Sequence, residues 1–175
     1  MPDPGLLDVL RRSGGLVAIA RQLDIPPPEA LAAAAALLPL VRAGFRRDAE
    51  QAETLSVGLT AQLLWLEELG GGALASAVLQ NDQSGSRPGE AIVARIFGPG
   101  LTPQVVAAAA AQSELPAETV AHVLPLLAML SGGYVSARAG HMSEADRLAE
   151  LGQLLDLDGE PNPLDALTGI ADQQA

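Results

Sequence analysis

The chain has 175 residues, of which 49% are apolar and 18% are charged, so it has enough apolar material to fold and is not a disordered chain. It contains no Cys, which excludes disulfides, thiolate catalysis and cysteine-ligated metal sites. The net charge is −11 and all ten basic residues are Arg, a balance that disfavours general affinity for nucleic-acid backbones and anionic lipid.

The apolar residues predict the fold class. They are mainly Ala, Leu and Val, whereas aromatic residues make up 2% of the chain, and this composition favours closely packed helices over sheets. We therefore predict an all-α protein, a bundle of short helices. A polar, turn-forming stretch at 81–89 separates an N-terminal helical unit, 1–80, from a C-terminal helical unit, 90–155, and an acidic tail with a short helix follows at 156–175.

The N-terminal part of the chain predicts a cytoplasmic location. Acids stand where a secretory signal peptide needs basic residues, and Asp8 and Arg11 break the apolar run that would follow. The longest apolar run, 30–41, has twelve residues. Because a helix needs about 20 residues to cross a bilayer, we expect a cytoplasmic protein without a membrane span.

Two segments, 16–44 and 105–133, share a pattern of a helix, a short turn and a longer helix with an LPL triplet. The number of residues from the turn to the triplet differs by four between the two segments, close to one helical turn of ~3.6 residues. The apolar faces of the two longer helices therefore keep the same orientation relative to their turns. A duplicated unit and a chance likeness of Ala-rich helices both fit this pattern. The matching turn residues are Gln22, Asp24, Ile25 and Pro26 in the first segment and Gln112, Glu114, Leu115 and Pro116 in the second.

Local signals predict where two helices begin. Thr102 followed by Pro103 is typical of an N-cap with proline at the first helical position. Ser143 with Asp146 resembles a capping box ahead of a further helix. We therefore expect helices to start at these two places.

Other residues interrupt the helical pattern. Pro39 and Pro125 each lie in a strongly apolar stretch, where proline kinks a helix or marks a boundary between two shorter helices. The polar stretch 47–54 either starts a solvent-facing helix or joins two helices.

The longer helix of each segment is apolar on more than one face. Leu37 in the first and Leu126 in the second lie on a different face from the main apolar stripe. Since a chain of this size has little material to cover two such helices, we predict self-association or a protein partner through them.

Trp65 and a cluster of arginines complete the candidate interaction residues. Trp65 is the only Trp, and it packs in the core or anchors an interface. Arg42, Arg46 and Arg47 form the best basic patch, which either stabilises the negative end of its helix or binds an acidic partner or the acidic second half of another copy.

The second half of the chain has a short helix ending in IFG, a Q-x-x-L-P turn, an LPLLA helix ending in Gly and a late acidic loop, in the segments 91–98, 112–116, 123–133 and 155–166. In this pattern it is similar to a YidB-like bacterial family of unknown function. This resemblance implies a helical, homeodomain-like fold and no established activity, substrate or cofactor. The acidic loop departs from the family, because Glu160, Pro161 and Pro163 replace its usual Gly-rich and Asp-rich run. The first half of the chain matches the family only through the pieces LDIPPPEAL and LLPLVRAG.

Few residues could carry chemistry. His122 and His141 do not form a pair of histidines at helical spacing, and no nucleophile elbow, P-loop or dinucleotide-binding fingerprint occurs. The acidic loop from Asp156 has Pro161 and Leu167 where a calcium-binding EF-hand needs Gly and Glu, so it is a solvated turn or at most a weak divalent site. We predict no catalytic residue, no cofactor and no metal ion.

These observations favour a non-enzymatic helical interaction or scaffold protein of unknown pathway. The alternatives are a homeodomain-like, nucleic-acid-associated module and a carrier of an apolar ligand between Ala-rich helices. Nucleic acid is disfavoured because neither second helix offers Arg, Lys, Asn or Gln at its start for reading bases. The sequence does not indicate a small-molecule ligand.

Overall fold

The computed structural model describes residues 6–80 and 87–139 together with Ser143 and Asp146. In this part of the chain, 86% of the residues are helical and no strand occurs, so the predicted all-α bundle is confirmed. Its helices are α1 (Leu6–Arg12), α2 (Gly15–Leu23), α3 (Pro27–Glu50), α4 (Leu55–Leu69), α5 (Ala73–Leu79), α6 (Arg87–Ile96), α7 (Gly98–Ser113) and α8 (Ala117–Ala139).

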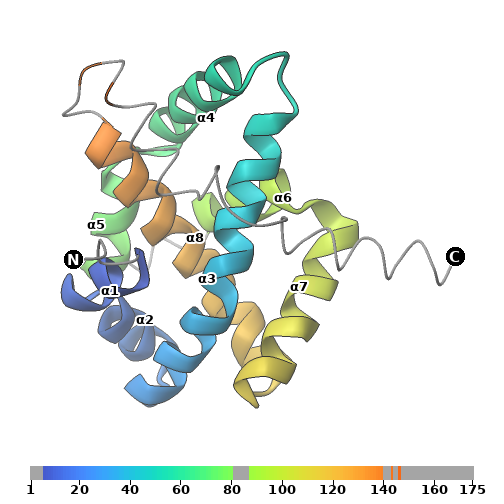
Figure 1. Cartoon of the computed structure of the whole chain (residues 1–175). Coiled ribbons are helices and arrows are strands. Elements are labelled where there is room, and N and C mark those ends of the chain that lie inside the picture. Colours follow the sequence, from blue (N-terminus) through green and yellow to red (C-terminus); the bar gives the residue numbers. More distant parts are fainter. Residues whose placement is uncertain (1–5, 81–86, 140–142, 144–145, 147–175) are drawn as a thin grey trace, which may run out of the picture.

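The two longest helices, α3 and α8, form the centre of the bundle. Figure 1 shows α3 running through the middle of the molecule, with α8 crossing behind it. The helices α1, α2, α4, α6 and α7 each pack against both central helices, and α5 packs against α8. The core therefore lies along α3 and α8, where Leu37, Leu124 and Leu127 are completely or almost completely buried.

The two helix-turn-helix segments have the same turn geometry. Asp24 and Glu114 follow the last residues of α2 and α7 in the left-handed conformation, with φ of 56° and 59°. The carbonyl oxygens of Pro26 and Pro116 then each accept a hydrogen bond from the backbone N–H four residues later, at 3.3 and 3.2 Å. Because residues other than Gly rarely adopt a positive φ, the likeness seen in the sequence extends to an unusual backbone geometry.

The predicted start of α7 is wrong. This helix begins at Gly98, four residues before Thr102, and Pro103 lies inside it. Pro99 stands in the first turn, where proline is well tolerated because the first N–H groups of a helix have no partner inside it. Thr102 does not cap the helix: its Oγ1 donates a hydrogen bond to the carbonyl oxygen of Gly98, one turn earlier, at 2.7 Å.

The other local predictions have mixed outcomes. The Asp146 N–H donates a hydrogen bond to Ser143 Oγ at 3.3 Å, as the predicted cap requires, but the helix expected after it lies outside the described residues. Pro39 and Pro125 lie inside the continuous helices α3 and α8, so neither marks a boundary between two helices. The stretch 47–54 joins two helices, because α3 ends within it at Glu50 and α4 begins at Leu55, directly after the stretch.

Some predicted segments fall wholly or partly outside the described residues. Within 81–89, the structure describes the last three residues, which form the start of α6 at Arg87. The acidic tail 156–175, with its predicted turn and short helix, lies outside the described residues, as does His141.

The prediction that no segment spans a membrane is wrong. Both α3, with 24 residues, and α8, with 23, are long and apolar enough to cross a membrane, and α6 with α7 would add a third span if this pair, bent by 100°, acted as one. The prediction rested on uninterrupted apolar runs, whereas a spanning helix tolerates isolated polar residues when its average stays apolar. The predicted cytoplasmic location is overturned with it. In this bundle 56% of the apolar window of α3 and 72% of that of α8 are buried.

Candidate functional site

The helix α4 is fixed at both ends by residues that suit helix termini. Thr54 precedes it, and Thr54 Oγ1 accepts a hydrogen bond from the Val57 N–H at 3.2 Å, which is a typical N-cap. Gly70 and Gly71 follow it with φ of 139° and 56°, conformations that favour glycine. Because Gly70 and Gly71 turn the chain sharply, α4 and α5 become two separate helices.

The inner face of α4 packs against α3 and α8. Leu59, Leu63 and Leu66 are buried on this face. A Cβ atom on Gly58 would overlap the carbonyl oxygen of Ala49, so glycine is what lets the backbones of α4 and α3 approach so closely. The inner face therefore fixes the position of the whole helix.

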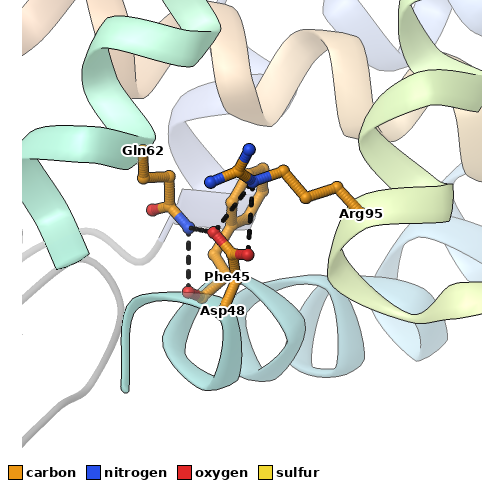
Figure 2. Close-up of polar contacts among 4 residues, drawn as sticks. All are labelled: Phe45, Asp48, Gln62 and Arg95. Atoms are coloured by element: carbon orange, nitrogen blue, oxygen red, sulfur yellow. Dashed lines mark hydrogen bonds and ion pairs between the residues drawn. The ribbon is translucent and has the colours of Figure 1, made fainter. Parts of the chain in front are cut away.

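A polar cluster, which we call the clasp, ties α4 to α3 and α6. Gln62 is 2% exposed, and its Nε2 donates hydrogen bonds to the Phe45 carbonyl oxygen at 3.0 Å and to Asp48 Oδ2 at 2.9 Å. Arg95 Nε donates to both carboxylate oxygens of Asp48 at 3.2 Å. Figure 2 shows Gln62 reaching in from α4 and Arg95 from α6, with Asp48 on α3 between them. The clasp therefore satisfies a buried amide and a largely buried carboxylate together.

Trp65 lies next to the clasp. Its ring is partly buried and packs against the core, and the Arg95 guanidinium stands over it at 4.5 Å from the ring centroid. Such a cation–π contact contributes about 0.5–1 kcal/mol at a partly exposed site. Trp65 therefore has a packing role, and part of its ring still reaches the surface.

The outer face of α4 is apolar and uncovered by the described residues. We define it as Val57, Ala61 and Leu64, which follow one another at spacings of four and three residues and so share one side of the helix. Val57 is 57% exposed and Leu64 is 59% exposed, the two highest values among the large apolar side chains described. The next turn on the same side carries Glu67 and Glu68, both exposed. The outer face is thus an apolar stripe that ends in two carboxylates.

The structure separates the other predicted interaction residues from this face. Leu37 and Leu126 are 0% and 3% exposed and lie in the core, so neither can touch a partner while the fold is intact. Arg46 forms an ion pair with Glu50 at 2.9 Å within α3, and Arg42 is also engaged in an interaction. Arg47 is exposed in the last turn of α3, where a cation favours the negative end of the helix.

Among the described residues, no group of three or more His, Asp or Glu side chains could hold a metal ion. His122 is exposed on α8 and stands apart from the clasp, whose members are all occupied by one another.

Sequence reasoning missed both the clasp and the outer face of α4. The three polar members of the clasp come from positions 48, 62 and 95, and the longest of these separations, 47 residues, leaves no local pattern. The outer face did leave a signal, since Val57, Ala61 and Leu64 have helical spacing, but α4 is apolar on its other sides as well. No family model matches the chain, and neither a curated protein nor a solved structure matches it.

Proposed function

We propose that this protein is a non-enzymatic helical interaction protein that binds a partner through the outer face of α4. The observation that carries the proposal is the exposure of Val57 and Leu64 on one stripe of a helix whose opposite side is buried. An exposed apolar stripe of this kind is unfavourable in water, and binding a partner removes it from water.

The clasp supports this proposal because it holds α4 rigidly. Gln62 bonds α4 to α3, and Arg95 extends the bonding to α6 through Asp48. A helix held in this way presents its outer face in one geometry, so binding requires little ordering of the protein. The resemblance of the second half to a YidB-like family is a separate proposal, and it does not indicate a partner.

In-cell photo-crosslinking tests the proposed surface. A photo-crosslinking amino acid replaces Leu64 in one variant and Val17, an exposed residue of α2 that is 47% exposed, in a matched control. We expect a protein adduct from position 64 that is absent from position 17 and is lost when Val57→Gln is added. If position 64 gives no adduct, or the same adducts as position 17, the proposal is wrong.

A second candidate function is insertion into a membrane through α3 and α8. It is supported by the length and apolar character of both helices. Because 56% and 72% of their apolar windows are buried in the bundle, their neighbours would have to separate from them in lipid. Alkaline extraction of membranes from expressing cells tests it: an inserted chain stays with the lipid, and a chain that is released contradicts insertion.

A further inference from the structure

We infer that the partner segment which docks on α4 is an amphipathic helix with Lys or Arg beside its apolar stripe. This inference rests on the proposed function of the outer face of α4. It adds the chemical class of the partner, which follows from the shape and charge of that face.

The shape of the outer face suits a helix. Val57 and Leu64 are seven residues apart, which corresponds to about 10 Å along the axis at ~1.5 Å per residue. Apolar side chains at this spacing match the anchors at positions i, i+3 or i+4, and i+7 by which one helix packs on another. Ala61, between them, leaves room for a side chain of the partner.

The charge at the end of the outer face selects a cationic partner. Glu67 and Glu68 are exposed in the last turn of α4, and neither the first nor the last turn of this helix contains a basic residue. The C-terminal end of a helix already carries a partial negative charge, so two carboxylates there are unfavourable and attract a cation. Arg95 points its guanidinium at Asp48 and Trp65 instead.

The same charge disfavours an anionic lipid surface as the occupant. A membrane that approached Leu64 would bring its headgroups beside Glu67 and Glu68, which repel anionic lipid and gain nothing from zwitterionic lipid. A cationic helix instead gains from both the apolar stripe and the carboxylates.

Peptide binding, followed by the fluorescence of Trp65, tests the inference. Trp65 is the only Trp of the chain and lies on α4, so its emission reports on this helix. The probes are three 18-residue amphipathic peptides with the same Leu stripe and with Lys, Gln or Glu on the polar face. We expect the Leu/Lys peptide to bind about fivefold tighter than the Leu/Gln peptide, since exposed ion pairs contribute modestly, and the Leu/Glu peptide to bind weakest.

Matched variants assign the binding to the outer face and its carboxylates. Leu64→Gln should weaken binding of the Leu/Lys peptide at least about tenfold, whereas Val17→Gln, at an apolar position on α2 that is 47% exposed, should leave it unchanged. The double variant Glu67→Gln with Glu68→Gln should remove the preference for Lys over Gln. The control Glu114→Gln with Glu118→Gln, which removes two exposed acids elsewhere, should keep that preference.

The possible failures are distinguishable. If all three peptides bind equally and Leu64→Gln weakens them all, the outer face docks helices but the cationic class is wrong. If Leu64→Gln changes none of them, docking through the outer face is itself wrong. Binding to zwitterionic vesicles, or self-association in light scattering, that depends on Leu64 would also overturn the inference, because the occupant would then be lipid or a second copy.

Discussion

The helices α8 and α4 look alike in sequence but differ in how the bundle covers them. Both are apolar on most sides, yet in α8 the side chains of Val120, Leu124 and Leu127 are at most 1% exposed, whereas Leu64 on α4 is 59% exposed. The reason is position: α8 is contacted by α1 to α7, and α4 packs mainly against α3 and α8 on one side. An apolar helix therefore predicts burial without predicting which sides are covered, and the uncovered side is where function is best sought.

The largest expected effect comes from the covered helix. Leu127→Ala removes a side chain that is completely buried in α8, and we expect the free energy of unfolding to fall by about 2–5 kcal/mol because a cavity remains. Chemical denaturation measures this loss, provided that the slope of the unfolding free energy against denaturant concentration is the same in both proteins. A loss below about 1 kcal/mol would mean that α8 is not the centre of the core.

The sequence predicts features that depend on neighbouring residues, and it does not predict contacts between residues far apart in the chain. The all-α fold, the two matching turns at Asp24 and Glu114 and the hydrogen bond from Asp146 to Ser143 are local features, and a short sequence pattern predicts each of them. The start of α7 was misplaced because two proline signals, at Pro99 and Pro103, lie one turn apart. The clasp and the uncovered side of α4 depend on which helices meet in space, and one sequence contains no direct signal for that.

The second largest effect on the unfolding free energy is expected where α4 packs against α3. Gly58→Ala places a Cβ atom against the carbonyl oxygen of Ala49, and since backbone cannot move as easily as a side chain, we expect a loss of about 1–3 kcal/mol in unfolding free energy. Gly100→Ala is the matched control: it lies in α7 with nothing within 4 Å of the added atom, and should stabilise the chain by roughly 0.5–1 kcal/mol. Equal effects of the two variants would show that α4 is not closely packed on α3.

The clasp gives a third, smaller effect. Asp48→Asn weakens the bonds to Arg95 and Gln62 at a carboxylate whose side chain is 10% exposed, and we expect a loss of about 1–2 kcal/mol. Asp8→Asn is the control, because the described partners of Asp8 are Arg11 and Arg12, whose side chains are 59% and 72% exposed, and such pairs contribute about 0–1 kcal/mol. Hydrogen exchange should also speed up in α4 for the first variant alone.

The smallest expected effect is on the uncovered side, and it decides whether that side is free. Leu64→Ala makes the same chemical change as Leu127→Ala. Leu64 is already 59% exposed in the folded chain, however, so truncating it takes little away from the apolar surface that folding buries. Ala also favours a helix as well as Leu does, and we therefore expect a change within about 0.5 kcal/mol in denaturant unfolding. A loss of about 2 kcal/mol or more would mean that another part of the chain covers Leu64, since only burial produces a cost of that size. In that case the stripe of Val57, Ala61 and Leu64 would be a core surface of the chain, and partner binding through α4 would lose its physical basis.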